Sequence, residues 1–291
     1  MEHGIDNLKK LIYKHGFGEL EDELLKIARP SIRVQTTPVE DESELAIGQS
    51  KLGGRPDLPK EMDWMSRPRE DGDVVYLWFI GQINLVDVAG YDVEHLLPKR
   101  GILYFFVNFI RKRGRVLYYK GNLSELERKV APFELPQMPF GQENFAPCSI
   151  EFVPEVNVCR SDMWQKLHQK SYQVSDNSME KIRRIGAFSS ATSYVHSHRY
   201  VNRLLGKAFA VPDMQLECQL IDDTGNPYGD TEEQRQAAQK RKSEWQLLFQ
   251  VGSDENANMM WSDMGTICFY IRRKDLAERK FDDVCVGFFS S

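Results

Sequence analysis

A short loop near residue 55 holds the first side chains that could do chemistry. Arg55 and Asp57 stand in a stretch, residues 53–59, that also contains two glycines and two prolines. The planar guanidinium of an arginine donates hydrogen bonds in pairs, so Arg55 could clamp a carboxylate or a phosphate. Charged residues of loops on a rigid scaffold often carry binding sites. The alternative is an internal ion pair between Arg55 and Asp57 that holds the loop against the strands, and the two readings stand about even.

Two glutamines occur at matching places in apolar segments. The stretch LWFIGQINL at 77–85 resembles LLFQVGSD at 247–254 when Gln82 is placed on Gln250. A primary amide has two donors and two acceptor lone pairs to satisfy if it is buried. The two amides could face a ligand between two halves of the protein. We favour the structural alternative, in which each amide bonds the loop of its own half, because buried polar side chains normally find partners inside the protein.

Oxygen-bearing side chains gather again in residues 253–263. Asp254 and Asp263 bracket a segment with two asparagines, and Trp261 stands close to Asp263. Calcium requires six to eight oxygen ligands. The segment lacks a complete calcium-binding loop, and short acidic side chains are well suited to turns and caps. We therefore predict no metal site, and Trp261 either lines a pocket wall or fills the core.

The sequence contains no motif for nucleophilic catalysis or for nucleotide binding. It has neither a nucleophile elbow of the GxSxG type nor a glycine-rich phosphate loop, so we predict no cofactor. The formal net charge is −5 and the basic clusters at 111–115 and 240–242 are short, which argues against a nucleic-acid partner. The ligand-binding candidates are Arg55, Asp57, Gln82, Gln250, Asp254, Trp261 and Asp263.

Cysteine usage and hydropathy bear on the compartment. The five cysteines are widely spaced, and Cys218, Cys268 and Cys285 lie among apolar residues, which favours buried thiols over disulfides. The first residues lack the apolar stretch of a signal peptide. The longest apolar run, residues 102–110, is about half the roughly twenty residues that a membrane-spanning helix needs. We therefore expect a cytoplasmic protein with no membrane partner.

Hydrophobic periodicity outlines the elements. Apolar residues at helical spacing predict two helices before Pro30, and alternation from Ser31 predicts a strand. Thr231 and Gln234 have capping-box spacing and open a polar helix. Runs rich in aromatic and β-branched residues predict further strands at 74–84, 101–109, 115–119, 148–153, 215–221, 245–252, 265–271 and 284–289.

The matched segments around the two glutamines indicate an internal duplication. We predict a mainly β fold of the α+β type, with two duplicated antiparallel-sheet halves related by pseudo-two-fold symmetry. The predicted parts are an N-terminal helical segment at 1–30, a first β-rich half at 31–160, a helical connection at 161–203 and a second β-rich half at 204–291, which together form one compact domain.

Several motifs also carry a resemblance to a known family. They are KLGGRPDLP at 51–59, FIGQINL at 79–85, LPKRGILYFF at 97–106, LFQVGSD at 248–254, MWSDMG at 260–265 and FDDV at 281–284. In these the chain resembles the YwqG-like proteins, a bacterial family of unknown function, from about residue 45 to the end. It departs from the family pattern at 207–213, where KAFAVPD replaces an aromatic-Pro-Asp sequence. The resemblance implies a mainly β fold with duplicated halves and no established reaction, and the occurrence of some relatives beside toxin systems suggests an immunity or interaction role.

Two functions follow as hypotheses. The first is a cytoplasmic protein-binding module, with exposed tryptophans as anchors because aromatic residues dominate binding hot spots. The candidate anchors are Trp64, Trp78, Trp164 and Trp261. The second is an enzyme or small-ligand binder with a polar cleft between the halves, which requires Arg55, Asp57, Asp254 and Asp263 to converge.

Overall fold

The computed structural model of the 291-residue chain describes residues 2–68, 74–109, 113–132, 135, 144–158, 162, 187–188, 201–208 and 213–289. Within these ranges the protein is mainly β, with one 10-stranded sheet, two small two-stranded sheets and several helices. The predicted helical connection at 161–203 lies almost entirely outside the described residues, as does Trp164.

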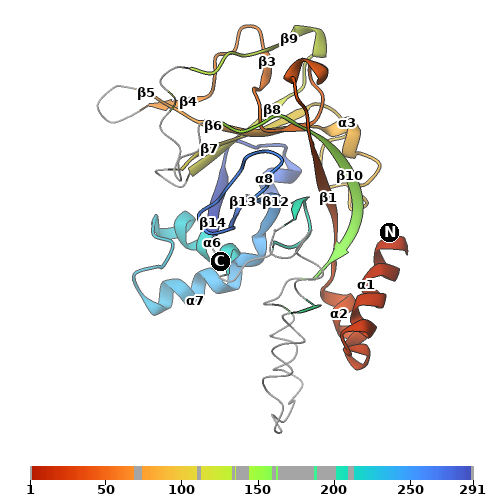
Figure 1. The fold of residues 1–291 in the computed structure, drawn as a ribbon. Helices are drawn as coiled ribbons and strands as arrows, with labels where there is room; N and C mark the ends of the chain where they lie inside the picture. Colours follow the sequence, from red (N-terminus) through yellow and green to blue (C-terminus); the bar gives the residue numbers. More distant parts are fainter. Residues whose placement is uncertain are drawn as a thin grey trace.

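The large sheet is antiparallel throughout and has the strand order β14-β13-β12-β11-β1-β10-β2-β6-β7-β8. Its strands are β1 (Arg29–Pro38), β2 (Lys51–Leu52), β6 (Trp78–Asn84), β7 (Ile102–Asn108), β8 (Arg113–Tyr119), β10 (Cys148–Asn157), β11 (Asn202–Leu204), β12 (Trp245–Gly252), β13 (Thr266–Arg272) and β14 (Val284–Phe289). The long strands β1 and β10 form the central pair (Figure 1). Four strands lie on each side of this pair.

The sheet curves until its two edge strands, β8 and β14, contact each other, so it is a nearly closed barrel. A glycine permits this approach: a Cβ atom added at Gly114 of β8 would lie 2.3 Å from Cγ2 of Val286 in β14. Closure also shields edge strands, whose unpaired backbone groups would otherwise be open to pairing with other chains.

The main core lies inside this curved sheet. Phe105 of β7 packs against Phe249 of β12 and Phe269 of β13, with ring centroids 4.7 and 5.2 Å apart. Every residue of β7 is buried, so its outward-facing side chains are covered as well. This explains why the segment is a continuous apolar run rather than an alternating one.

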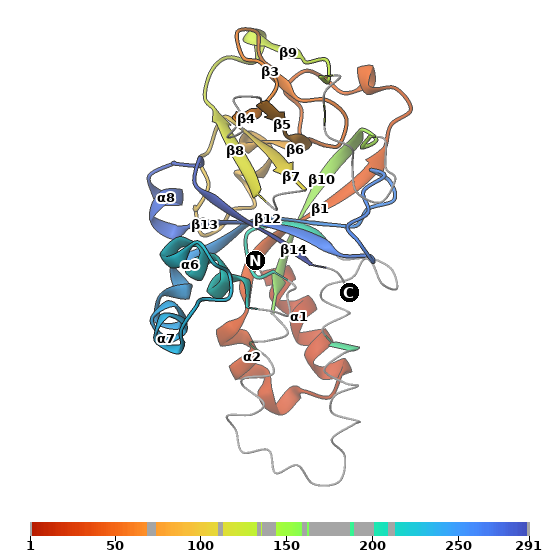
Figure 2. The same cartoon turned by 90° about the vertical axis from the view of Figure 1, so that its left-hand side faces the viewer.

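Three groups of elements cover the outside of the barrel (Figures 1 and 2). The first group, which we call the cap, is the segment that contains β3 and β9, and it packs on β6 and β7. The second group is the helices α6 and α7, which lie along the β12–β14 side. The third group is α1 and α2, which lie at the end of β1 and β10 opposite the cap. The short strands are β3 (Asp57–Pro59), β4 (Ser66–Pro68), β5 (Val74–Tyr76) and β9 (Leu126–Arg128). The helices are α1 (Glu2–Lys14), η1 (Gly18–Leu20), α2 (Glu21–Ile27), η2 (Glu42–Glu44), α3 (Leu85–Val88), η3 (Leu123–Glu125), α6 (Met214–Thr224), α7 (Glu232–Arg241), η5 (Lys242–Glu244) and α8 (Arg273–Ala277).

The strand predicted at 215–221 is wrong, because this segment belongs to helix α6. The Asp213 carboxylate accepts a hydrogen bond from the Leu216 backbone N–H and caps the first turn. Gly225 ends the helix in the left-handed conformation, with φ at 75°. The helix predicted to begin at Thr231 is confirmed, since the capping box of Thr231 and Gln234 opens α7.

The prediction of free thiols also fails for two cysteines. A disulfide joins Cys218 of α6 to Cys285 of β14, while Cys148 and Cys268 are buried and remain thiols. In the described ranges, no helix has both the length and the apolar character needed to span a membrane. Cytoplasmic location stays a prediction, and the disulfide does not favour it because reducing compartments rarely keep such bonds.

Candidate functional site

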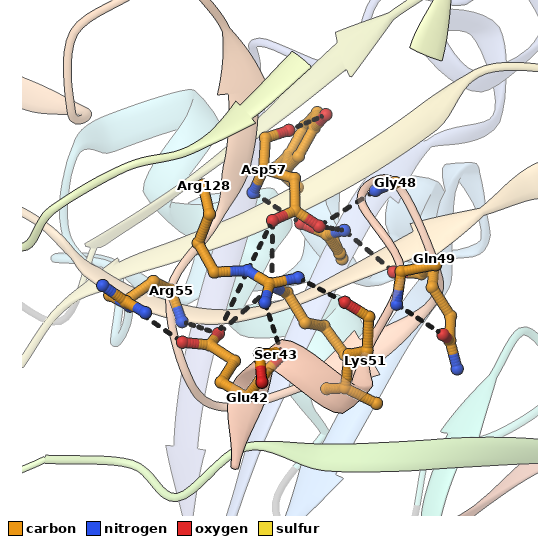
Figure 3. Close-up of polar contacts among 12 residues, drawn as sticks. Glu42, Ser43, Gly48, Gln49, Lys51, Arg55, Asp57 and Arg128 are labelled. Atoms are coloured by element: carbon orange, nitrogen blue, oxygen red, sulfur yellow. Dashed lines mark hydrogen bonds and ion pairs between the residues drawn. The ribbon is translucent and has the colours of Figure 1, made fainter. Parts of the chain in front are cut away.

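The strongest gathering of charged side chains lies between the cap and the outer face of β6 and β7 (Figure 3). At its centre is the fully buried carboxylate of Asp57, which accepts hydrogen bonds from four donors. They are the Gly48 backbone N–H at 3.0 Å, Lys51 Nζ at 3.2 Å, Gln82 Nε2 at 2.8 Å and Arg128 Nε at 2.9 Å. We call Glu42, Lys51, Arg55, Asp57, Gln82 and Arg128 the cap network.

Local backbone geometry brings these residues together. Gly53 and Gly54 follow β2 and both have positive φ, 68° and 65°, which turns the chain sharply toward β3. A Cβ atom at Gly53 would lie 2.1 Å from the carbonyl oxygen of Ala146, so only glycine fits there. The pairing of β3 with β9 then places Arg128 directly opposite Asp57. The glycine pair therefore serves the fold rather than a phosphate.

The electrostatics of the cap network balance burial against pairing. Burial alone would raise the pKa of Asp57, but Lys51, Arg128 and the Gly48 N–H hold the pKa below its ordinary value. Burial lowers the pKa of Lys51, against the opposing effect of Asp57 and Glu42. The pKa of Glu42 is lowered despite burial, by hydrogen bonds from Arg55 and by Lys51. Both carboxylates are thus held charged.

Arg55 does not pair with Asp57, and the predicted internal bridge between them is wrong. Its side chain is 46% exposed, and its Nε donates to Glu42 Oε2 at 2.8 Å. Its backbone N–H donates to Glu42 Oε1 at 2.6 Å. Asp57 instead takes Lys51 and Arg128 as cationic partners. Arg55 lies at the outer edge of the cap network and is the member that solvent reaches most.

Both glutamines bond the protein's own backbone, as the structural alternative predicts, although Val201 lies just before the predicted second half at 204–291. Gln82 donates to the Gln49 carbonyl at 2.8 Å and accepts from the Asp57 backbone N–H at 2.9 Å. Gln250 donates to the Val201 carbonyl at 2.8 Å. Each amide has 0% exposure, so neither reaches a ligand on the surface. Their partners in the neighbouring strands are Lys51 and Arg203, respectively.

Asp254 belongs to a different network from Asp57. Its Oδ2 accepts from Thr36 Oγ1 and from Asn202 Nδ2, both at 2.8 Å, and its Oδ1 accepts from the Asn256 backbone N–H at 3.0 Å. The last contact is the expected Asx turn. Asp263 is exposed. Asp254 therefore lies in a network separate from that of Arg55 and Asp57, and the described residues hold no cluster that suits a metal ion.

Trp261 is a core residue. It is 4% exposed, its Nε1 donates to the Gly252 carbonyl at 3.0 Å, and its ring stacks on Phe109 at 5.4 Å. Trp64 is 7% exposed and donates to the Leu77 carbonyl at 2.8 Å. Trp78 is half-buried against Phe145. The proposal that Trp64 or Trp261 is an exposed anchor is therefore wrong.

Sequence reasoning missed three members of the cap network. Lys51 opens the KLGGRPD motif but reads as an ordinary polar residue at the start of a strand, and its side chain has 0% exposure. Glu42 and Arg128 lie far from the motif in the sequence. The only available signal was the unusual presence of a lysine inside an otherwise buried motif, since a buried charge requires an opposite charge.

The chemistry open to these groups is limited, because each buried carboxylate is already saturated by donors. Cys148 is no better as a nucleophile, since burial and the charge of Asp254 raise the pKa of its thiol to about 12. The cap network thus has the character of a structural anchor. It fixes the backbone of the cap through hydrogen bonds to Gly48, Glu42 and Leu45.

Comparison with known proteins places the chain in a family. No curated protein matches the sequence. The family model described as "Domain of unknown function (DUF1963)" matches residues 50–288. These residues include strands β2 to β13, most of β14, and every residue of the cap network except Glu42. The chain therefore belongs to the DUF1963 family, a domain of unknown function.

Proposed function

We propose that this protein is a binding module for another protein and that it uses an apolar patch on the cap. The patch consists of Ile47, Val86 and Leu123, which are 41%, 61% and 44% exposed. They come from the segment after η2, from α3 and from η3. Exposed apolar side chains that gather at one place are typical of interaction surfaces.

Contacts around Gly48 connect the three segments that carry these residues. A Cβ atom at Gly48 would lie 2.9 Å from Cδ2 of Leu123. The Gly48 carbonyl accepts from Asn84 Nδ2 at 3.0 Å, and Asn84 Oδ1 in turn accepts from the Val86 backbone N–H at 3.2 Å. Ile47 directly precedes Gly48 in the chain. Gly48 therefore links the three segments that form the patch.

The cap network supports the patch from below, and this is the observation that carries the proposal. Asp57 fixes the Gly48 N–H, and Arg128 donates to the carbonyl oxygens of Glu42, the first residue of η2, and Leu45, which directly follows η2. A surface whose backbone is already fixed loses little conformational entropy on binding. In this proposal the buried charges of the cap network keep the backbone of the binding surface fixed.

The charges beside the patch indicate the chemistry of the partner. The exposed acidic residues Glu44, Asp87 and Glu125 lie on η2, α3 and η3, and these three elements carry no basic residue. An apolar centre with an acidic rim complements a partner that has an apolar contact surface and a basic rim. Such complementarity speeds association and selects partners.

The enzyme alternative has less support. It relied on convergence of Arg55, Asp57, Asp254 and Asp263, but Asp57 and Asp254 lie in separate networks and Asp57 has no exposed atom. A catalytic carboxylate must reach the proton that it transfers. Binding through the surface of the cap requires no such access.

The patch can be tested by affinity capture from a lysate of the source cells with three forms of the protein. The Val86→Asp/Leu123→Asp variant places charges in the patch, and Tyr228→Asp changes a side chain that is 72% exposed in the loop between α6 and α7. We expect a protein that wild type and Tyr228→Asp retain in stoichiometric amount, that the patch variant loses, and that high salt releases. Equal capture by all three forms, or no retained protein, would contradict the proposal.

Two narrower statements belong to the same proposal. Immunity to a toxin, which the resemblance to YwqG-like proteins implies, is one form of protein binding. It requires that the captured partner be harmful when expressed alone and harmless when expressed with wild type. Loss of protection in Val86→Asp/Leu123→Asp, with protection kept in Tyr228→Asp, is the expected result, and protection by both variants would contradict it.

We also infer that the two halves of the sheet arose by duplication. The strands on one side of the β1–β10 pair run β11, β12, β13, β14, and those on the other run β2, β6, β7, β8. Three hydrogen bonds support the inference because each recurs at matching positions on the two sides. The bond from Gln82 Nε2 to Gln49 O corresponds to that from Gln250 Nε2 to Val201 O, and the bond from Gly53 N to Ile80 O corresponds to that from Leu205 N to Leu248 O. The bond from Asn84 N to Ser50 Oγ corresponds to that from Gly252 N to Asn202 Oδ1. An alignment of the two halves across family sequences should place Gln82 on Gln250, and a best alignment out of this register would contradict the inference.

A further inference from the structure

A groove of about 440 Å³ lies at the other end of the protein from the cap, between helix α1 and the central strand pair β1–β10. Its volume falls in the range of small-molecule sites, roughly 300–1,000 Å³. Gly4 allows α1 to come near β10, because a Cβ atom there would already lie 3.1 Å from Cγ2 of Val156. The groove shares no residue with the apolar patch or with the cap network.

The floor of the groove carries an excess of positive charge. The Glu155 carboxylate pairs with two guanidinium groups, with Arg33 Nε at 2.8 Å and Arg203 Nε at 2.9 Å. Burial would raise the pKa of Glu155, but the two arginines hold the pKa below its ordinary value, so the group is charged. Two cations thus share one anion. Lys10 at the rim adds a further positive charge.

Several donors along the groove have no partner in the part of the chain that the structure describes. Arg33 uses only its Nε, and its two terminal amino groups make no hydrogen bond there. The Gln35 and Asn7 amides and the Lys10 ammonium, which also line the groove, likewise form no side-chain hydrogen bond or ion pair with the described residues. The Arg33 side chain is 25% exposed, which leaves its free edge accessible. A guanidinium edge with two free amino groups matches the two oxygens of a carboxylate.

Apolar side chains form the rest of the lining. Leu8 and Leu11 of α1 face Val153, Pro154 and Val156 of β10 across the groove. Leu8 and Leu11 belong to the cluster that holds α1 on the sheet, with Val156 packed against the same cluster. A ligand that fills the groove would therefore meet a cationic floor and apolar walls. Inorganic phosphate or sulfate would interact with the cationic floor but not with the apolar walls.

We propose that this groove binds a carboxylate attached to an apolar body, with Arg33 as the anchor of the carboxylate. The site is separate from the protein-binding patch and goes beyond the proposed function. The same chemistry occurs in aliphatic carboxylic acids and at the C-terminus of a peptide that ends in an apolar residue. The experiment below distinguishes these two sources.

The test is isothermal titration calorimetry of the full chain with four probes. They are octanoate, the neutral octanamide, a short peptide that ends in leucine with a free carboxylate, and the same peptide with an amidated C-terminus. We expect one or both carboxylates to bind at least about tenfold more tightly than the matched amide, because a charge-assisted pair is worth about 1.5–3 kcal/mol. Octanoate binding alone assigns the source to small acids, and peptide binding alone assigns it to chain termini.

Three variants locate the binding site. Arg33→Gln leaves Glu155 paired with Arg203 and Ser31, and it should weaken carboxylate binding about tenfold while amide binding stays unchanged. Lys10→Gln should weaken it by up to about fivefold, as an exposed charge does. Lys26→Gln, an exposed lysine of α2 outside the groove, is the matched control and should have no effect.

Thermal melts of each variant distinguish a local from a global effect. If Arg33→Gln melts well below wild type, Arg33→Lys serves in its place, because it keeps the charge next to Glu155 and removes the two-pronged edge. Binding of neither carboxylate, equal binding of carboxylate and amide, or binding that Arg33→Gln and Arg33→Lys leave unchanged would overturn the proposal.

Discussion

Replacement of Asp57 by asparagine tests whether the cap network stabilises the fold. The Asp57→Asn side chain keeps the shape but loses the charge that Lys51 and Arg128 share. An amide nitrogen in place of Oδ2 also meets two donors, Gln82 Nε2 and the Gly48 N–H. Removal of one partner from a buried ion pair costs about 3–5 kcal/mol, because the remaining charges stay buried without compensation. For a chain of this size this corresponds to a fall in melting temperature of roughly 6–20 °C.

The assay is urea unfolding at pH 7, followed by tryptophan fluorescence. Trp64 lies in the apolar cluster under the cap and reports on its loosening. Glu94→Gln, an exposed carboxylate with no described partner, is the matched control and should change the free energy of unfolding by less than about 0.5 kcal/mol. A loss below about 1 kcal/mol for Asp57→Asn would refute the view that the network anchors the cap.

Further predictions concern pH, redox state and backbone geometry. The pKa values of Glu42 and Asp57 are lowered in the folded state, so both carboxylates stabilise the fold above about pH 4.5 and lose this contribution as pH falls through the lowered pKa values. Measurements of the free energy of unfolding at decreasing pH should show this loss. The loss should be smaller in Asp57→Asn. Reduction of Cys218–Cys285 should lower the free energy of unfolding by about 2–5 kcal/mol, and a melt with dithiothreitol that matches the untreated melt would contradict a disulfide in solution. Gly53→Ala should destabilise the fold by at least about 2 kcal/mol, because φ is 68° there and the new methyl group meets the Ala146 carbonyl; a melt like that of wild type would disprove this reading.

Much of the sheet was predictable, because strands that bury one or both faces have a clear pattern. The aromatic and β-branched runs at 245–252 and 284–289 coincide with β12 and β14. The matched glutamines were also informative, since an amide inside an apolar strand must bond to something nearby. Gln82 and Gln250 each donate to a nearby backbone carbonyl, as that reasoning requires.

Helix α6 was predicted as a strand because its apolar residues alternate with polar ones, as they do in a half-buried strand. Leu216, Cys218 and Leu220 alternate with polar residues over a short stretch, and period two outweighed the cap signals at Asp213 and Gly225. That error concealed the disulfide as well. With Cys218 on a strand, nothing indicated that it would face Cys285 of β14.

The cap network could not be assembled from sequence because its contacts depend on how the loop around Gly53 turns and on which strands pair. Arg128 reaches Asp57 only through the pairing of β9 with β3, and Glu42 reaches Arg55 across the turn at Gly53 and Gly54. Spacing along the chain carries no information on such pairs. One of the two readings of Arg55 and Asp57 paired them with each other, whereas the structure pairs Arg55 with Glu42 and Asp57 with Lys51 and Arg128.

Hydrogen exchange on the chain alone and in complex with its captured partner tests the central claim most directly. The account predicts that binding slows exchange in residues 42–48, 85–88 and 123–126, the backbone of the apolar patch and its rim. It also predicts no change in α7, on the other side of the barrel. Slowed exchange in α7 with none in those three segments would contradict it.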